Sequence, residues 1–326
     1  MAQLTAAIIG TGVIGAGWAA RYLANGYQVK AWDPGENAQQ KLQQSIDNAW
    51  PSLKKLGLAP GASKANLIFT DSLASACDDA DIIQESAPEV VAIKCSLLKQ
   101  ISEYAPTDAI IGSSTSGFKP SVLQADIALP ERLVVTHPFN PVYLLPLVEV
   151  VGGEKTSPET IAKVQQIYQA IGMHPLHVRK EIDGHLSDRL LEALWRENLH
   201  LVNDGIATTG ELDDAITYGP GLRWAIMGTN LTYHLAGGDT GMRHMLEQFG
   251  PALKLPWTKL TAPELSESLI NKMVAGTQEQ AANRSVKTLE QLRDNCLVSI
   301  MEALAEYEVG AGKVLSDYRK TLPTHE

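Results

Sequence analysis

The sequence predicts an α/β protein in which a doubly wound, mostly parallel sheet is followed by an all-helical domain. In the first half, short apolar runs typical of buried strands alternate with amphipathic helical stretches. Beyond residue 182 the strand pattern all but disappears, and long helical periodicities replace it. We therefore expect two domains, 1–182 and 183–326, with the boundary near Glu181-Ile182-Asp183-Gly184.

Composition narrows the class of protein. A chain of 326 residues with 44% hydrophobic and 20% charged residues is typical of a soluble globular protein with a large core. A net charge of -10 argues against a nucleic-acid groove or an anionic membrane surface as partner. There is no apolar run of the ~20 residues that span a bilayer and no secretory signal, so we expect a cytoplasmic protein. Cys77, Cys95 and Cys296 are widely spaced, which predicts free thiols and no metal site.

The first strand, Leu4 to Ile9, leads directly into a glycine-rich turn and then a helix. In such a turn one glycine permits the tight bend, one admits a pyrophosphate and one lets helix and strand pack closely. A second strand, Tyr27 to Trp32, ends in an acid placed to bind ribose hydroxyls. That carboxylate would repel a 2′-phosphate, so the Rossmann-type domain is expected to bind NAD rather than NADP. The cofactor residues predicted here are Gly10, Thr11, Gly12, Val13, Ile14, Gly15 and Asp33.

The alternation of strand and helix continues as far as residue 178. The expected helices are 39–56, 90–104 and 157–171, and the expected strands are 67–70, 81–84, 109–112, 133–136, 147–151 and 173–178. In a parallel sheet the carboxyl ends of the strands form the ligand edge. This places the Glu85 loop, the hydroxyl-rich Ser116 loop and His137 at one edge, where we also expect four cofactor contacts, from Ala87, Glu89, Lys94 and Ser114.

His137 and Glu149 flank a proline-rich turn between two apolar runs. A carboxylate within a buried strand needs a partner, and an imidazole across the turn is the nearest one. Bonded to one ring nitrogen, the carboxylate would fix the tautomer and leave the other nitrogen as a base. The alternative is a solvated edge-strand glutamate with a turn histidine that has no catalytic role.

The second half is read as helices. A long amphipathic helix is expected over 185–203 and another over 285–308, with a capping box at Thr208–Glu211 and a further helix start at Thr261–Glu264. Their apolar faces exceed what one small domain buries, which predicts a homodimer.

Several motifs in register resemble the 3-hydroxyacyl-CoA dehydrogenase family, in a similarity that covers the first domain and continues into the second. They are the glycine loop, Glu85 to Glu89, Ser114 to Ser116, His137 to Pro141 and Leu147 to Val150. The resemblance implies that Ser116 and His137 contact the substrate hydroxyl, that Glu149 orients His137, and that Asn140 belongs to the site. It also implies that the helical domain carries substrate and dimer contacts.

Two departures from the family pattern concern the substrate. Asp188 stands where relatives carry asparagine, and its charge would favour a cationic group nearby. The alternative is that Asp188 pairs with Arg189 or with the helix dipole. Arg223 resembles the branch of the family that oxidises small hydroxy-carboxylates, where it could hold a carboxylate bidentately.

Aromatic residues gather in the segments expected to form the site. They are Phe139, Tyr143, Tyr218, Trp224, Tyr233, Phe249 and Trp257. Singly each is best read as core, but together they could form a cage for a quaternary ammonium, with Phe139, Tyr143, Trp224 and Trp257 as substrate residues.

Within the family, three runs closely resemble the L-carnitine dehydrogenase subgroup: Pro138 to Val151, Asp188 to Trp195 and Leu253 to Trp257. The resemblance implies NAD-dependent oxidation of the small molecule L-carnitine to 3-dehydrocarnitine. The alternatives are a dehydrogenase for L-gulonate, another small 3-hydroxy acid or a 3-hydroxyacyl-CoA, and, more remotely, a non-catalytic NAD-binding protein like the related crystallins.

Overall fold

The chain folds into two compact units in the computed structural model. The first comprises residues 1–188, 294–306 and 311–326, and the second residues 189–293 and 307–310. The structure describes residues 3–225, 227–237, 239, 242–249, 251, 255–259, 266–269, 271, 282 and 284–323. The predicted helix start at Thr261–Glu264 lies outside these residues.

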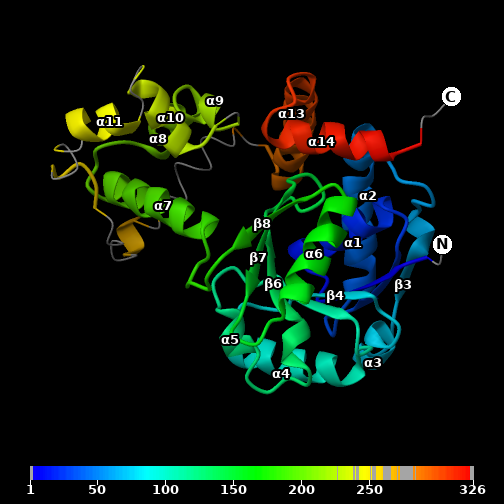
Figure 1. The fold of residues 1–326 in the computed structure, drawn as a ribbon. Coiled ribbons are helices and arrows are strands. Elements are labelled where there is room, and N and C mark those ends of the chain that lie inside the picture. The colour runs from blue at the N-terminus through cyan, green and yellow to red at the C-terminus, as the bar shows by residue number, and fades with distance from the viewer. Residues whose placement is uncertain are drawn as a thin grey trace. The chain divides into compact units, whose positions relative to one another are not determined.

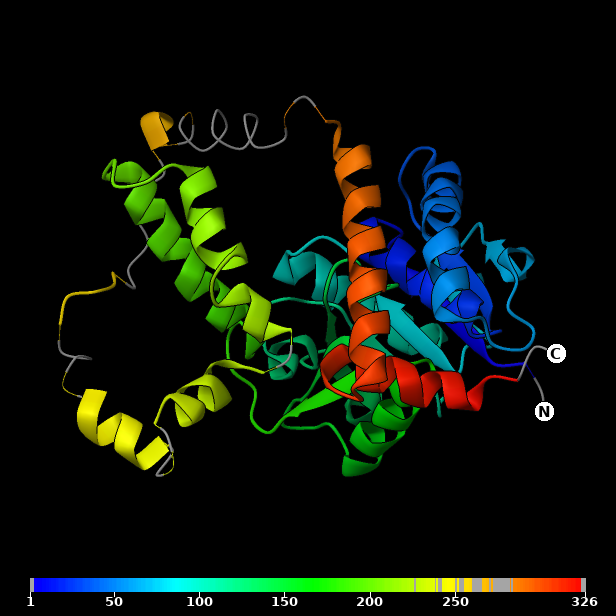
Figure 2. The same ribbon diagram turned by 90° about the horizontal axis from the view of Figure 1, so that it is seen from above.

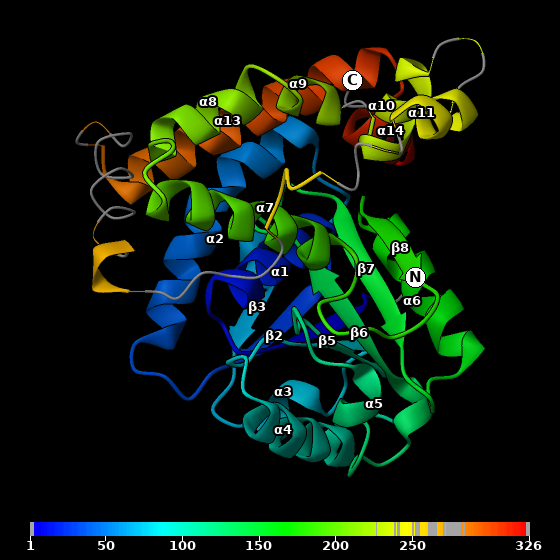
Figure 3. The same cartoon turned by 90° about the vertical axis from the view of Figure 1, so that its left-hand side faces the viewer.

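The first unit is built on one eight-stranded sheet in the order β3-β2-β1-β4-β5-β6-β7-β8, of which β2, β3 and β5 to β8 are labelled in Figure 3. All neighbouring strands are parallel except β6 and β7, which are antiparallel. The strands are β1 (Thr5–Ile9), β2 (Gln28–Trp32), β3 (Leu67–Phe69), β4 (Ile82–Glu85), β5 (Ile110–Ser113), β6 (Leu133–Pro138), β7 (Leu147–Gly152) and β8 (His174–Val178). The predicted doubly wound, mostly parallel sheet is therefore confirmed.

Helices cover both faces of this sheet (Figure 1). On one face α1 (Val13–Ala24), α2 (Ala38–Leu56) and α6 (Pro158–Ala170) bury their apolar side chains in one core cluster with the strands. On the other face α3 (Leu73–Cys77), α4 (Val91–Tyr104) and α5 (Pro120–Leu123) form a second cluster. The buried apolar residues of the central strands point into one cluster or the other, which explains the apolar runs in their sequence.

The end of the chain returns to the first unit. Helix α13 (Val286–Glu306) contributes its part from Asp294 onward, and α14 (Gly310–Thr321) its part from Ala311 (Figure 2). Both pack in a third apolar cluster against α2 and the loop between β6 and β7. Its buried members are Leu56, Leu144, Val298, Met301 and Leu315.

The second unit is helical in its described residues. Its helices include α7 (Ser187–Asn203, from Arg189 onward), α8 (Thr209–Thr217), α9 (Gly221–Trp224), α10 (Thr229–Ala236), α11 (Met242–Phe249) and the part of α13 before Asp294. The predicted capping box is present: the Thr208 hydroxyl accepts from the Glu211 N–H, and the Glu211 carboxylate accepts from the Thr208 N–H. Among the described residues no helix combines the length and the apolar character needed to cross a bilayer.

The loop between β6 and β7 is held by a buried arginine. Arg21 of α1 donates its Nε–H to the Val142 carbonyl at 3.0 Å, and its terminal nitrogens reach three further carbonyls at 3.4 Å. Burial lowers the pKa of Arg21 to about 10. Because all of these acceptors are backbone carbonyls, the guanidinium acts as a fixed support for the loop that joins the two strands carrying His137 and Glu149.

Candidate functional site

The glycine-rich turn follows β1 and opens α1, as predicted. Gly10 has a φ of +88°, and a Cβ there would lie 2.7 Å from the Ser86 carbonyl oxygen. A Cβ on Gly15 would lie 1.9 Å from the Gly10 carbonyl oxygen, so the helix and the strand approach too closely for any side chain. A Cβ on Gly12 would meet nothing within 4 Å. The turn therefore exposes open backbone at a helix N-terminus, which is the geometry that receives a pyrophosphate.

Asp33 faces this turn from the end of β2. Its Oδ2 accepts from the Thr11 N–H at 2.7 Å and the Thr11 hydroxyl at 3.1 Å, and its Oδ1 accepts from the Gly35 N–H at 2.8 Å. Beside it lies a cleft of about 800 Å³ whose lining includes Gly10, Gly12, Asp33, Ser86 and Ala87. An acidic group, a glycine cradle and a cleft of this size fit the adenosine half of NAD.

A buried ion pair supports the β4 loop. The Lys94 ammonium, 1% exposed, contacts the Glu85 carboxylate at 2.9 Å, the Ala87 carbonyl at 3.0 Å and the Glu89 carboxylate at 3.4 Å. The other oxygen of Glu85 accepts from the Ser113 hydroxyl at 2.5 Å. Each of the three ammonium hydrogens thus has an acceptor within the protein. Lys94 and Glu89, which were expected near the cofactor, therefore form an ion pair with each other.

Glu89 also organises the loop that carries Ser116. Its Oε1 accepts from the Thr115 hydroxyl, from the Ser116 N–H at 3.0 Å and from the Gly117 N–H at 3.3 Å. The Ser116 side chain itself is exposed. The carboxylate therefore fixes the backbone of this hydroxyl loop and leaves the serine hydroxyl accessible.

His137 and Glu149 lie opposite each other in the antiparallel register of β6 and β7. The sequence predicted His137 after the strand, whereas β6 extends to Pro138 and includes it. The His137 Nδ1 lies 2.9 Å from the Glu149 Oε2, and both side chains are buried. The imidazole therefore keeps Nε2 for another partner.

The second oxygen of Glu149 caps the start of α7. Its Oε1 accepts from the N–H groups of Leu186 and Ser187 at 3.0 Å each and from the Ser187 hydroxyl at 3.3 Å. Burial alone would raise the pKa of Glu149, but the bonds from His137 and from these N–H groups outweigh it and hold the pKa below its usual value. Glu149 is thus a carboxylate that stays ionised in a buried position.

Asp188 completes this first turn. Its Oδ2 lies 3.9 Å from the His137 Nε2, the nitrogen that Glu149 does not use. Two carboxylates therefore flank one imidazole, one on each ring nitrogen. Negative charge next to the open nitrogen favours a cationic molecule there and disfavours an anionic one.

A second histidine, His185, belongs to this group, and no pattern in the sequence indicated it. Its ring is fully buried, its centroid is 5.6 Å from that of His137, and its Nε2 lies 3.3 Å from the Thr115 carbonyl oxygen. A carbonyl only accepts, so Nε2 carries the hydrogen and Nδ1, which has no hydrogen-bond partner, is the bare nitrogen. A φ of 46° after Gly184 turns the chain back to reach this position, a conformation uncommon outside glycine and asparagine.

The remaining substrate residues predicted from the sequence fall into two groups. In the first unit Phe139 packs at 4.9 Å from the His137 ring, Asn140 is exposed, and Tyr143 packs against two core clusters and donates to Asp294. In the second unit Arg223, Tyr218, Trp224, Tyr233 and Trp257 are exposed. The Phe249 side chain lies outside the described residues.

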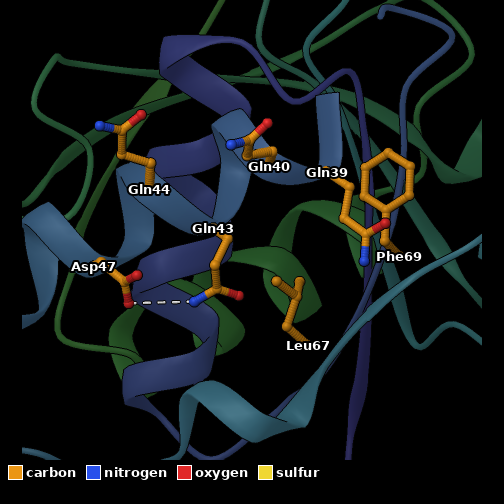
Figure 4. A pocket seen from close by; sticks show the side chains of 7 residues that line it. All are labelled: Gln39, Gln40, Gln43, Gln44, Asp47, Leu67 and Phe69. Atoms are coloured by element: carbon orange, nitrogen blue, oxygen red, sulfur yellow. Dashed lines mark hydrogen bonds between the residues drawn. The ribbon is translucent and has the colours of Figure 1, made fainter. Parts of the chain in front are cut away.

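A second, smaller hollow lies away from these groups, on α2 and β3 (Figure 4). Four glutamines between residues 39 and 44 line it together with Asp47, Leu67 and Phe69, and the Gln43 amide donates to Asp47 at 3.2 Å. Its lining residues include neither a glycine turn nor a cation that could hold a pyrophosphate, so the cleft beside Asp33 is the better cofactor site.

Known proteins are similar to this chain over nearly its whole length. The family model for the 3-hydroxyacyl-CoA dehydrogenase NAD-binding domain matches residues 5–182, and that for the C-terminal domain matches residues 184–284. The L-carnitine dehydrogenase of Bacillus cereus is 59% identical, with 93% of each chain covered. That of Pseudomonas putida is 58% identical, with 96% of this chain and 98% of the relative covered.

Solved structures agree with this grouping. The NAD⁺-dependent dismutase 5-formyl-3-hydroxy-2-methylpyridine 4-carboxylic acid 5-dehydrogenase superposes with a TM-score of 0.78 at 29% identity, covering 93% of this chain and 99% of the other. The (S)-3-hydroxybutyryl-CoA dehydrogenase of Ralstonia eutropha superposes with a TM-score of 0.61 at 25% identity, covering 86% and 94%.

The burial of His185 predicts a pH dependence of stability. Burial and the neighbouring His137 lower the pKa of His185 in the folded protein. Below about pH 6.5 the His185 imidazole therefore binds a proton in the unfolded chain more readily than in the folded protein. The free energy of unfolding consequently falls as the pH falls. Urea unfolding at a series of pH values from about 7.5 to 5 measures this slope.

His185→Phe keeps a ring in the buried position and removes the titrating group, so the slope in this interval should become shallower. The matched control is His174→Phe, at an exposed position of β8, which should leave the slope of the wild type in place. Equal slopes in the His185→Phe variant and the wild type would contradict the assignment of the buried neutral imidazole.

Proposed function

The chain belongs to the 3-hydroxyacyl-CoA dehydrogenase family and is an NAD-dependent 3-hydroxy dehydrogenase, and we propose that its substrate is L-carnitine, which it oxidises to 3-dehydrocarnitine. The observation that carries the proposal is the negative charge of Asp188 beside the open nitrogen of His137. L-carnitine combines a 3-hydroxyl group with a trimethylammonium on the adjacent carbon. The high identity to L-carnitine dehydrogenases supports the same substrate.

His137 acts as the general base in this proposal. Its Nδ1–H donates to Glu149, so Nε2 has a lone pair that removes the proton of the substrate hydroxyl. The Glu149 carboxylate then stabilises the imidazolium that forms. A positioned base of this kind contributes about 10²- to 10⁴-fold to the rate. NAD, when bound, accepts the hydride that leaves the carbinol carbon, so the two electrons and the proton are both accounted for.

Ser116 is proposed to donate a hydrogen bond to the same substrate oxygen. The hold of Glu89 on the loop backbone supports this role, because it leaves the exposed hydroxyl free to turn toward a ligand. As the oxygen gains carbonyl character it needs a donor, and the hydroxyl supplies one.

Arg223 and the aromatic residues of the second unit are proposed to bind the two ends of the substrate. Arg223 is exposed on its unit and has the fork of donors that matches a carboxylate. Trp224 and Trp257 expose 40% and 71% of their surface, so their rings have face area available for an ammonium group. Phe139, beside the His137 ring, is proposed to contact the substrate as well.

A homodimer and a cytoplasmic location remain part of the proposal. Helix α7 exposes Leu190, Leu191, Leu194 and Trp195 on the second unit, an apolar surface suited to association with another copy. Light scattering of the purified protein measures the oligomeric state directly, and a monomer at micromolar concentration would contradict the dimer.

The substrate proposal predicts selective turnover. NADH production with L-carnitine, D-carnitine, L-gulonate and L-3-hydroxybutyryl-CoA should be confined to L-carnitine. His137→Ala should abolish that turnover and leave NADH binding intact, since the residue lies outside the cofactor cleft. Turnover confined to L-gulonate or the CoA ester would contradict L-carnitine as substrate while leaving the NAD site and the His137–Glu149 pair unaffected.

Asp188→Asn tests the charge argument with nearly the same side-chain shape. L-carnitine is compared with the same enantiomer of 3-hydroxy-5,5-dimethylhexanoate, in which carbon replaces the ammonium nitrogen. We expect kcat/KM for L-carnitine to fall about 5- to 30-fold relative to the analogue that lacks the ammonium charge, the size of a charge interaction in a partly solvated site. Equal changes in kcat/KM for the two substrates would show that Asp188 does not recognise the ammonium group.

A further inference from the structure

A chain of polar side chains runs through the core of the first unit to the cofactor cleft. Gln84 of β4 is fully buried, and so are Thr136, Tyr168 and Trp18 around it. A Cβ on Gly112 would come within 2.6 Å of the Thr136 hydroxyl and 3.0 Å of the Gln84 amide oxygen, so the glycine makes room for these groups. Apolar side chains would fill the same space without the cost of satisfying polar atoms, so the network calls for a functional reason.

The Gln84 amide has partners at both ends. Its oxygen accepts from the Tyr168 hydroxyl at 2.8 Å, and its nitrogen donates to the Ser114 hydroxyl at 2.7 Å and the Thr136 hydroxyl at 3.0 Å. In this arrangement the amide oxygen accepts from Tyr168 and also from the Thr136 hydroxyl at 3.2 Å, and the amide nitrogen faces Ser114. The amide therefore presents an N–H, rather than a carbonyl, to the serine.

Ser114 receives a second donor. The Trp18 Nε1–H points at the same hydroxyl oxygen at 3.1 Å. A serine oxygen has two lone pairs, and the two N–H groups of Trp18 and Gln84 occupy both. The third contact of Ser114, to the Ser86 hydroxyl at 3.0 Å, must therefore use the hydrogen of Ser114 itself.

The direction of the Ser114–Ser86 hydrogen bond determines where the Ser86 hydroxyl hydrogen can point. Its oxygen accepts from Ser114, so its own hydrogen points elsewhere. Ser86 lines the cleft beside Asp33, and its carbonyl is the group that a Cβ on Gly10 would strike. Ser86 therefore lines the cofactor cleft, and its backbone lies against the glycine turn.

We propose that the Ser86 hydroxyl donates a hydrogen bond to an acceptor oxygen of bound NAD, and that Gln84 and Trp18 set its direction through Ser114. Ser86 is then a cofactor-binding residue, and Gln84, which never touches the cofactor, is a positioning residue. The inference rests on NAD as the cofactor and not on L-carnitine as the substrate. It is therefore tested by NADH binding in the absence of any substrate.

Fluorescence titration of NADH into the purified protein gives the dissociation constant. Ser86→Ala should raise it about 5- to 10-fold, the usual worth of one hydrogen bond between neutral groups. Gln84→Met keeps the volume and removes the N–H that directs Ser114, so it should raise the constant about 2- to 5-fold. Ser45→Ala, at an exposed position of α2, is the matched serine control and should leave it unchanged.

The double variant separates positioning from a general loss of structure. Once Ser86 is alanine there is no hydroxyl left to direct, so adding Gln84→Met should weaken NADH binding no further. A Ser86→Ala variant that binds NADH as the wild type does would overturn the proposal. Losses that multiply in the double variant would overturn the part assigned to Gln84, because they would show that the amide supports the cleft independently of Ser86.

Discussion

The buried carboxylate of Glu149 is the interaction on which the candidate site depends. One oxygen binds the His137 imidazole, and the other accepts three donors from the first turn of α7. A buried charge is tolerated only when its hydrogen-bonding capacity is used, and here the partners are the catalytic candidate and the start of the next helix. The same group therefore fixes the imidazole and the place where Asp188 stands beside it.

Two further networks place the groups around this centre. Glu85, Lys94 and Glu89 hold the hydroxyl loop from the cofactor side, while the His185 ring holds the Thr115 carbonyl from the side of His137. The carbonyl and the N–H group of the Thr115–Ser116 peptide bond are therefore both hydrogen-bonded, the first to His185 and the second to Glu89. The backbone of Ser116 is thus held by neighbours that are themselves buried, while its exposed hydroxyl can still rotate.

Much of the fold and part of the site could be predicted from the sequence because the signals are local. The glycine turn, Asp33 and the capping box at Thr208 each depend on residues only a few positions apart or on one strand–helix–strand unit. The pairing of His137 with Glu149 followed from a short turn between two apolar runs. Asp188 could be noticed because it departs from a family pattern.

Other features depend on contacts between segments that are distant in the sequence, and no local sequence pattern predicts them. His185 and Thr115 are 70 positions apart in the sequence, and the left-handed backbone conformation at His185 brings the two residues together. Gln84 and Tyr168, which also form a hydrogen bond, are 84 positions apart. The periodicity predicted the long helix α13 but neither α14 nor the packing of parts of both helices on the first unit. The ends of the strands also differ from those predicted. His137 lies within β6 because its pairing with Glu149 extends the strand ladder.

The claim that Glu149 prepares His137 as a base is tested most directly by nitrogen NMR of the imidazole. In protein with ¹⁵N-labelled histidine, with His137 assigned from the His137→Ala variant, we expect the neutral imidazole to carry its hydrogen on Nδ1 and none on Nε2. Glu149→Gln should remove this preference. A hydrogen on Nε2 in the wild-type protein would contradict the claim, because that nitrogen could not then accept the proton of a substrate hydroxyl.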